Sequence, residues 1–282
     1  MKPKKHGSFH QKHSLGQNFI EDEALLSQLA ELSLVTAEDH VLEIGPGFGA
    51  LTKPLAERAK QVVSLEIDRT LIPILNVTLE KYANARVICD DVMRTNLSAL
   101  VAEVFGADCS SLRVAANLPY YITTDVLTKL MRELPQAKSI AVMIQKEVAQ
   151  RICAQAGTAQ YGAFTLLCQY YADCELLYDV PPSCFLPAPK VTSSVIRMTV
   201  RGKPPVEVPD ETLFFQVVRA AFAQRRKTLV NALSTLLGKD VDKSTIKSLI
   251  CACNLTETVR GERLSFADFA ELTQKIVKLR QK

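Results

Sequence analysis

The sequence VLEIGPGFG, residues 41–49, indicates how this chain folds. Val41 to Ile44 suit a short buried strand, and three closely spaced glycines follow it at positions 45, 47 and 49. Residues 51–59 then have the spacing of a helix. A glycine turn between a strand and a helix allows a ligand to approach the backbone closely, so this stretch predicts a ligand-binding α/β unit.

The same alternation of strand and helix continues along the chain. Apolar strand patterns lie at 41–44, 62–65, 86–89, 112–116 and 140–144, and helical patterns at 24–34, 51–59, 70–82, 124–133 and 146–155. Short apolar strands that alternate with helices indicate a parallel sheet covered on both faces. We therefore expect a doubly wound α/β fold, closed by an antiparallel pair at 174–180 and 191–200.

A change of composition marks a second domain. Residues 201–209, RGKPPVEVP, contain three prolines and a glycine, which is typical of a linker. Only helical patterns follow. We predict a domain of residues 1–202 and a small all-helical domain of residues 203–282.

Capping signals place the helices of that second domain. Asp210 can cap a helix that runs toward Leu237, where Gly238 would end it. Ser265, with Asp268 three positions later, predicts the start of another helix through a capping box.

Charge is unevenly distributed along the 282 residues, whose net charge is +4. Residues 1–13 form a basic arm with four lysines and no acidic residue, and residues 203–282 carry 14 Lys and Arg against 9 Asp and Glu. Residues 14–202 have a net charge of −5. Basic ends around an acidic middle are typical of a protein held on a polyanion, although solvated basic tails would look the same.

Composition restricts the class of protein. Hydrophobic residues make up 48% of the chain and charged residues 23%, as in globular proteins. No apolar run approaches the length that spans a bilayer, so we expect a cytoplasmic protein without a membrane partner. The eight cysteines lack the Cys-x2-Cys spacing of a zinc site, so we expect reduced thiols and no metal ion.

Acidic residues stand at the ends of the next two predicted strands. Glu66 lies 21 residues beyond Gly45, where its carboxylate could accept both hydroxyls of an adenosine ribose. Either Asp91 or its neighbour Asp90 could accept a hydrogen bond from the adenine. The glycine turn with Ala50 also fits G-x-G-x-x-A. Up to this point, the residues suit both a nicotinamide dinucleotide and S-adenosylmethionine.

The fourth strand ends at Asn117-Leu118-Pro119-Tyr120-Tyr121. An amino nitrogen conjugated to a ring is a poor nucleophile, and acceptors for both of its N–H groups would free its lone pair. The Asn117 side-chain oxygen and the carbonyl of Leu118 or Pro119 could be those acceptors, and Tyr120 could stack on the base. A strand that ends in a proline turn, with the tyrosine in the core, is the alternative.

The pair of acceptors at Asn117 and the residue after it favours a methyltransferase, because a nicotinamide enzyme would have no use for acceptors that hold an amino group. In addition, all four histidines precede or begin the first strand, so no base for hydride transfer is evident.

Along nearly its whole length the chain resembles the KsgA/RsmA-type ribosomal RNA small subunit (16S) adenine dimethyltransferases. The resemblance rests on eight motifs: SLGQNFI (14–20), EIGPGFG (43–49), NLPYY (117–121), QKE (145–147), YG (161–162), FLPAPKV (185–191), FAQRRKTL (222–229) and RGERLS (260–265). It implies a Rossmann-like class I methyltransferase domain that uses S-adenosyl-L-methionine. The substrate would be two adjacent adenosines in a hairpin near the 3′ end of 16S rRNA, within a precursor of the small ribosomal subunit. The protein would dimethylate both adenosines and would act as a monomer.

The resemblance also implies roles for individual residues. It selects Asp91 over Asp90 as the acceptor for the cofactor adenine. The position of Asp90 is often Gly or Gln in relatives. The resemblance makes Phe185 a second aromatic wall, so that the catalytic residues would be Asn117, Tyr120 and Phe185. The cofactor-binding residues would be Asn18, Ile20 through its backbone, Gly45, Glu66, Asp91 and Asn117.

Contact with RNA is expected at Arg225, Arg226 and Lys227, three consecutive cations that we place in a helix. A solvated helix face is the ordinary explanation of such a run, and the resemblance favours RNA. Lys190 could hold a phosphate or cap its own loop.

Three other functions remain open at this level. A 23S rRNA adenine methylase of the macrolide-resistance type would share the fold and the Asn-x-Pro-Tyr motif, whereas the segments 185–191 and 222–229 favour the small-subunit enzyme. A ribosome-assembly or transcription-factor-like binding protein with vestigial catalysis is disfavoured by the intact Glu66, Asn117 and Tyr120. A nucleotide oxidoreductase is the third alternative.

Overall fold

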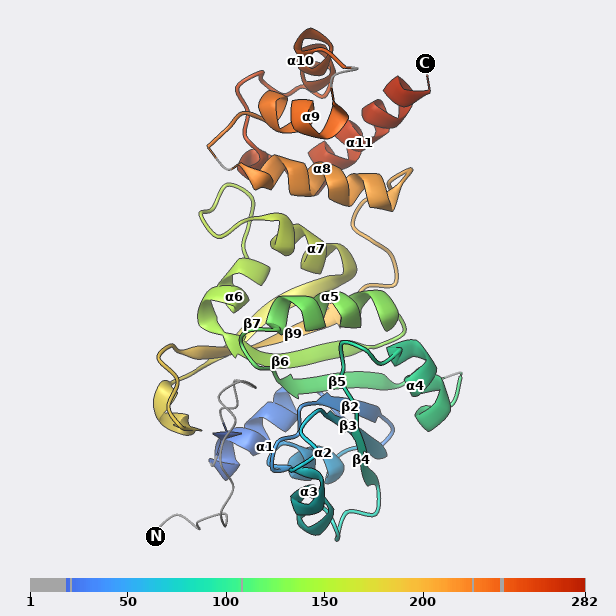
Figure 1. The fold of residues 1–282 in the computed structure, drawn as a ribbon, viewed down its shortest axis with the longest axis vertical. Helices are drawn as coiled ribbons and strands as arrows, with labels where there is room; N and C mark the ends of the chain where they lie inside the picture. The colour runs from blue at the N-terminus through green and yellow to red at the C-terminus, as the bar shows by residue number, and fades with distance from the viewer. Residues whose placement is uncertain (1–18, 21, 108, 225, 239–240, 282) are drawn as a thin grey trace. The chain divides into compact units, whose positions relative to one another are not determined.

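The computed structural model describes residues 19–20, 22–107, 109–224, 226–238 and 241–281. Their main feature is a seven-stranded sheet with the order β4-β3-β2-β5-β6-β9-β7 (Figure 1). Strands β1 and β8 form a separate two-stranded sheet. The strands are β1 (Phe19–Ile20), β2 (His40–Ile44), β3 (Gln61–Glu66), β4 (Ala85–Cys89), β5 (Leu112–Asn117), β6 (Ser139–Gln145), β7 (Ala172–Val180), β8 (Phe185–Leu186) and β9 (Ser193–Val200).

The first five strands of the large sheet are parallel and in register. Strand β2 lies between β3 and β5, and its last residue, Ile44, is opposite Leu65 of β3 and Ala116 of β5. The chain builds β2, β3 and β4 outward on one side and then returns to place β5 and β6 on the other. The order therefore reverses between β2 and β5, which is where open α/β sheets bind ligands.

Helices cover both faces of this sheet, as the sequence predicts. Val41 and Leu42 point to opposite faces, and both are 0% exposed. On one face, α1 and α2 pack in a cluster with Val41, Val62 and Ala115, and Figure 1 shows α5 on the opposite side. The helices are α1 (Glu23–Leu32), α2 (Thr52–Ala56), α3 (Ile72–Thr78), α4 (Leu97–Phe105), α5 (Thr123–Glu133), α6 (Lys146–Ile152), α7 (Ala163–Tyr171), α8 (Glu211–Ala223), α9 (Leu229–Leu237), α10 (Lys243–Cys251) and α11 (Phe266–Arg280), with short 3-10 turns η2 (Pro182–Cys184) and η3 (Gly261–Arg263).

The described chain divides into two compact units. The first contains the described residues up to Lys146 together with Leu177–Arg197, and the second contains Glu147–Leu176 and the chain from Met198 onward. Residues 147–176 thus group with the C-terminal helices. The division at residue 202 remains a prediction.

The helical part of the second unit has its own core, in which Phe214 and Phe269 are fully buried. The Tyr161 hydroxyl donates to the carbonyl of Leu264 at 2.9 Å, which ties α7's leading loop to the segment before α11. Gly261 lies so close to α8 that a Cβ at this position would be 2.8 Å from the Cβ and the carbonyl oxygen of Ala221. Only glycine fits there.

The expectation of one helix from Asp210 to Leu237 is wrong. Asp210 does cap α8, but this helix ends at Ala223 and α9 begins only at Leu229. In the turn, the Lys227 N–H donates to Gln224, and the Leu229 N–H donates to the carbonyl of Val259 at 2.8 Å. These two amides therefore have partners outside a helix, which favours the break. The capping box at Ser265 and Asp268 is confirmed at the start of α11.

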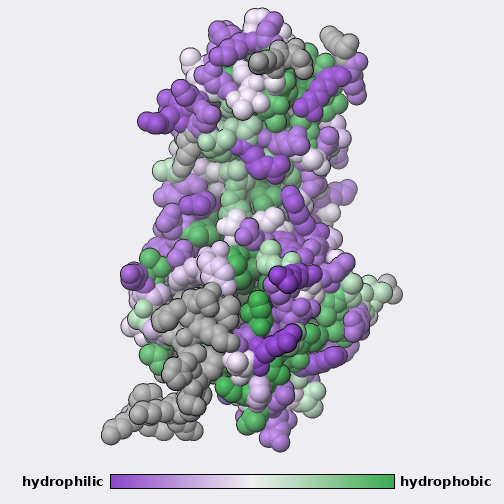
Figure 2. Space-filling model, viewed as in Figure 1, coloured by the Kyte–Doolittle hydropathy of each residue, from purple (hydrophilic) through white to green (hydrophobic). Residues whose placement is uncertain are grey.

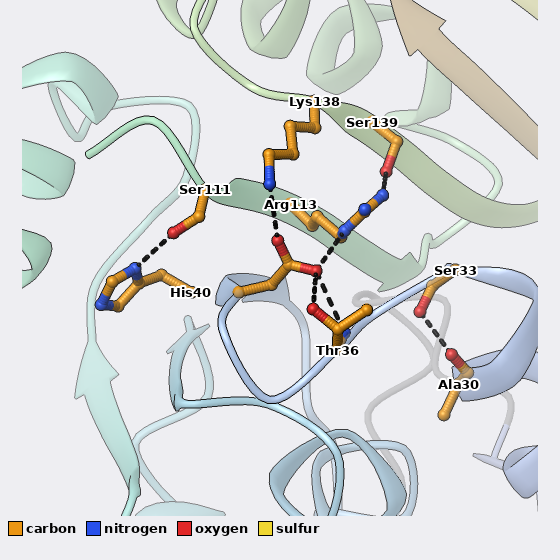
Figure 3. A network of polar contacts seen from close by, with 9 residues as sticks. Ala30, Ser33, Thr36, His40, Ser111, Arg113, Lys138 and Ser139 are labelled. Carbon is orange, nitrogen blue, oxygen red and sulfur yellow. Dashed lines mark hydrogen bonds and ion pairs between the residues drawn. The ribbon is translucent and has the colours of Figure 1, made fainter.

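A buried ionic network lies at the amino ends of β2, β5 and β6 (Figure 3). Asp39, which is 0% exposed, accepts hydrogen bonds from Arg113 at 2.7 Å and Lys138 at 3.2 Å, and from the backbone and hydroxyl of Thr36. Burial raises the pKa of Asp39, but these donors together lower it to about 2. The network therefore fixes three neighbouring strands at the edge opposite their carboxyl ends.

On the face drawn in Figure 2, hydrophilic side chains cover much of the surface, with apolar areas between them. None of the helices in the described ranges combines the length and the apolar character needed to cross a membrane.

Candidate active site at the carboxyl edge of the sheet

The glycine turn after β2 has the backbone conformation that its sequence predicts. Gly45, Gly47 and Gly49 have φ angles of 70°, 59° and 79°, a region that other residues rarely adopt. A Cβ at Gly45 would find no atom within 4 Å, whereas one at Gly47 would lie 3.0 Å from the Phe19 ring. The turn therefore presents open backbone at Gly45, next to the ends of β2 and β3.

Glu66, the last residue of β3, faces this turn. Its carboxylate accepts the N–H of Gly47 at 3.1 Å and the N–H of Asp68 at 2.8 Å, and the residue is 4% exposed. Burial raises the pKa of Glu66 above its ordinary value, and the two backbone donors oppose that rise. Each carboxylate oxygen still has a lone pair for a ribose hydroxyl.

A second buried acid, Glu43, lies in β2 beside Glu66. Thr52 and Ser64 each donate a hydroxyl hydrogen bond of 2.7 Å to Glu43. Burial raises the pKa of Glu43 to about 7, and the negative charge of Glu66 adds to the rise. Sequence reasoning assigns no role to Glu43. The available signal was an acidic residue inside an otherwise apolar strand, where an unpaired charge is costly.

Asp91 and Asp90 follow the end of β4. The Asp90 N–H donates to the carbonyl of Glu66 at 3.1 Å, so the end of β4 lies next to the end of β3. Asp91 is half-buried, and its carboxylate accepts the N–H of Met93 at 2.9 Å, whereas Asp90 is exposed. Exposed Arg94 lies 3.7 Å from the Asp91 carboxylate.

Asn117 is the last residue of β5, adjacent to the glycine turn in the sheet order, and it is half-buried. After it, the Leu118 N–H donates to Met143 of β6 at 3.1 Å. The Pro119 carbonyl accepts the N–H of Ile122 at 3.3 Å and the hydroxyl of Thr123 at 3.1 Å. The proline carbonyl therefore already has two donors within the chain.

Tyr120 is half-buried, and its hydroxyl lies 2.6 Å from the hydroxyl of Ser193. Burial raises the pKa of the Tyr120 phenol, which the hydrogen bond with Ser193 partly offsets. The next residue, Tyr121, is 58% exposed.

Phe185 and Ile20 lie together, because they are opposite each other in the antiparallel pair β1–β8. Each is 5% exposed, and both belong to the apolar cluster that includes α1. The structure therefore brings a predicted cofactor-covering residue and the predicted second aromatic wall into one small sheet. In this arrangement Phe185 is part of the core, and sequence reasoning did not foresee the β1–β8 pairing.

Among the other predicted site residues, Asn18 and Arg225 lie outside the described residues. Arg226 and Lys227 are exposed in the turn between α8 and α9, in the second unit, rather than in a helix. Lys190 is exposed. In the described ranges, no three His, Cys, Asp or Glu side chains gather closely enough to hold a metal ion.

Gly45, Glu66, Asp91 and Asn117 thus come from the ends of four adjacent parallel strands, at the topological switch point of the sheet. This arrangement at the carboxyl edge of a parallel sheet is that of Rossmann-like proteins, the class to which many methyltransferases belong.

The family follows from comparison with known proteins. The model of the family "Ribosomal RNA adenine dimethylase" matches residues 8–275. The chain is 47% identical over 270 residues to "Ribosomal RNA small subunit methyltransferase A" of Geobacillus thermodenitrificans (strain NG80-2), and the alignment covers 95% of this chain and 92% of the relative. It is 45% identical over 265 residues to the protein of that name from Alkaliphilus oremlandii (strain OhILAs), which covers 94% and 91%. The chain belongs to the ribosomal RNA adenine dimethylase family, whose methyl donor is S-adenosyl-L-methionine.

Two solved structures share the fold. A dimethyladenosine transferase from Plasmodium falciparum superimposes with a TM-score of 0.77 at 24% identity, over 92% of this chain and 98% of that one. The 23S rRNA methyltransferase ErmE superimposes with a TM-score of 0.68 at 22% identity, over 92% and 100%. At these identities the likeness establishes the Rossmann-like fold alone.

Proposed function

We propose that this protein dimethylates the exocyclic amine of two adjacent adenosines in a hairpin near the 3′ end of 16S rRNA. It would act as a monomer in the cytoplasm, on a precursor of the small ribosomal subunit. The observation that carries the proposal is the position of Asn117, at the end of the strand next to the glycine turn. The names of its relatives specify the small subunit.

The residues at the edge of the sheet fit S-adenosylmethionine. The open backbone at Gly45 would contact the methionine part, the Glu66 carboxylate would accept the ribose hydroxyls, and Asp91 would accept a hydrogen bond from the adenine. Ile20 would cover the cofactor together with Asn18. When bound, S-adenosylmethionine supplies an electrophilic methyl group.

Two acceptors would hold the substrate amine. The Asn117 side-chain oxygen is one, and we assign the other to the carbonyl of Leu118, because the Pro119 carbonyl already accepts from Ile122 and Thr123. With both N–H groups bound, the nitrogen lone pair is directed away from the ring system and toward the donor. Catalysis would therefore come from positioning and lone-pair localisation, with the amine proton released to water.

The target adenine must leave its base stack to reach this edge. Tyr120 would stack on one face of the adenine and Phe185 on the other. Because Phe185 is 5% exposed, this requires the β1–β8 segment to open or shift when RNA binds. Arg225, Arg226 and Lys227 would bind RNA phosphates.

The test is tritium-methyl transfer to separated small and large ribosomal subunits from cells that lack this gene, followed by analysis of the RNA nucleosides. We expect dimethyladenosine in 16S rRNA, located by a primer-extension stop near the 3′ end. A stop on 23S rRNA would instead identify a macrolide-resistance type of methylase. Binding to small subunits without methyl transfer would identify an assembly protein that has lost its catalytic activity.

A further inference from the structure

The hydroxyl groups of Tyr120 and Ser193 are joined by a hydrogen bond of 2.6 Å. Tyr120 lies in the loop that follows β5, and Ser193 is the first residue of β9. Ser193 is 0% exposed, whereas Tyr120 is half-buried. A rigid strand therefore holds the polar end of the aromatic side chain that we expect to bind the target base.

The position of Ser193 is itself fixed on both sides. The carbonyl of the preceding residue, Thr192, accepts the N–H of Lys146 at 3.0 Å. The following residue, Ser194, donates its hydroxyl to the Asp179 carboxylate at 2.6 Å, and the Lys146 ammonium group donates to the same carboxylate at 2.6 Å. Neighbouring residues of a strand point to opposite faces. Ser194 therefore anchors the strand on one face and Ser193 holds Tyr120 on the other.

The backbone alone does not determine where the Tyr120 ring lies. Thr123 and Ile122 hold the Pro119 carbonyl, which orders the loop, but rotation about the side-chain bonds of Tyr120 is a separate freedom. A hydrogen bond at the far end of the ring removes much of that freedom. A phenol is ordinarily protonated at neutral pH, and burial raises the pKa of the Tyr120 phenol further, so the hydrogen bond persists there.

We propose that Ser193 is a positioning residue, which holds the ring of Tyr120 in the orientation that stacks on the target adenine. This inference rests on the proposed function, in which Tyr120 contacts the base. Ser193 itself touches neither substrate nor cofactor, and its effect would pass entirely through the Tyr120 hydroxyl. Small errors in the orientation of a bound reactant slow a reaction markedly, so the effect should appear in the rate of methyl transfer.

A double-mutant cycle tests this directly. The four proteins are wild type, Ser193→Ala, Tyr120→Phe and the double variant, compared in single-turnover methyl transfer to undermethylated small subunits with saturating cofactor. Tyr120→Phe removes the same hydrogen bond without altering β9, so the test does not depend on a buried substitution. Ser33→Ala is the matched control, because it deletes a buried serine hydroxyl that donates at 2.6 Å to the carbonyl of Ala30, at the end of α1 and outside β9.

We expect each single variant to slow transfer about two- to tenfold, the loss that corresponds to one neutral hydrogen bond. The double variant should be no slower than either single variant, and affinity for S-adenosylmethionine should be unchanged. Ser33→Ala and Tyr120→Phe should instead multiply their effects, because independent sites add in free energy. Wild-type rates for Ser193→Ala, or multiplied losses in the double variant, would overturn the proposal.

Tyr120→Ala separates this inference from the proposed function. If Tyr120→Ala transfers methyl groups at the wild-type rate, Tyr120 does not contact the base, and both proposals fail at this residue. If Tyr120→Ala is slow while the cycle shows no coupling, Tyr120 binds the base and Ser193 does not position it.

Discussion

The carboxylate of Glu66 accepts the backbone N–H of Gly47 at 3.1 Å. The acid that we expect to bind the ribose therefore also fixes the glycine turn that we expect to contact the cofactor. Substitutions at Glu66 act on both, and the two effects can be separated by the choice of replacement.

Replacing Glu66 with Ala should weaken binding of S-adenosylmethionine by roughly 1.5–3 kcal/mol, the scale of hydrogen bonds to a charged group. Glu66→Gln keeps an acceptor for the Gly47 N–H and removes only the charge, so it should lose less binding free energy for S-adenosylmethionine than Glu66→Ala. Calorimetry measures both affinities, and RNA binding should be nearly unchanged. Wild-type cofactor affinity in Glu66→Ala would exclude Glu66 from the site.

Phe185 requires a variant that separates stacking from folding. Phe185→Ala should slow methyl transfer by roughly ten- to a hundredfold, since base stacking is worth about 1–3 kcal/mol. It should also lower the free energy of unfolding by about 3–5 kcal/mol, because the ring is buried. Phe185→Leu retains most of the apolar volume. Slow transfer by a stable Phe185→Leu would support the stacking role, whereas full activity would confine Phe185 to the core.

The cations between α8 and α9 should determine the salt dependence of RNA binding. Substituting Arg225, Arg226 and Lys227 with Ala should reduce the slope of log affinity against log salt by about 0.7–0.9 for each lost phosphate contact. A matched control replaces Lys278 and Arg280, exposed in the last turn of α11. Equal slopes for the two variants would show that the run is merely solvated. Cofactor affinity should stay at the wild-type value in both.

Glu43 should make stability fall as pH rises. Its pKa is about 7 in the folded protein against an ordinary value of 4.5, so the folded state keeps the proton longer than the unfolded state. The stabilisation that the raised pKa of Glu43 gives the folded state is complete below pH 4.5 and is lost as the pH rises to about 7. It amounts to something on the order of 3 kcal/mol. Chemical unfolding at pH 5 and pH 8 should show a smaller difference for Glu43→Gln than for wild type; an identical difference would contradict the raised pKa.

Asp39 should have the opposite dependence. Its pKa is lowered from 3.8 to about 2, so its stabilising effect is present above pH 3.8 and disappears as the pH falls toward 2. Asp39→Asn leaves Arg113 partly buried without its carboxylate and should cost about 3–5 kcal/mol at pH 7. The exposed Lys138 contributes little of this, because solvent screens it. Urea unfolding at pH 7 and pH 3 should show the gap between variant and wild type narrowing in acid.

Much of the fold could be predicted because its signals are local. The predicted strand at 41–44 corresponds to His40–Ile44, and the one at 140–144 to Ser139–Gln145, since apolar runs between turns mark buried parallel strands. Because parallel strands end at the same edge of a sheet, the predicted ends of β2, β3 and β5 place Gly45, Glu66 and Asn117 together without any knowledge of distances.

What the sequence could not show depends on residues far apart in the chain. The pairing of Ile20 with Phe185 links two-residue strands, which are too short to have a pattern of their own. The break between α8 and α9 depends on Val259, which takes the amide of Leu229. The hydrogen bond between Tyr120 and Ser193 spans 73 residues. It forms because Ser193, and not its neighbour Ser194, lies on the face of β9 that Tyr120 contacts.

The close approach of Gly261 to Ala221 has a genetic consequence. A methyl group at position 261 would have to push η3 away from α8, because the atoms that it would meet include backbone. The strain falls on the helical core and on none of the residues at the sheet edge, so heat should inactivate a Gly261→Ala protein that works when cool. Codon 261 is thus a natural place for a temperature-sensitive allele, with which a cell could be made to lose this protein at a chosen moment.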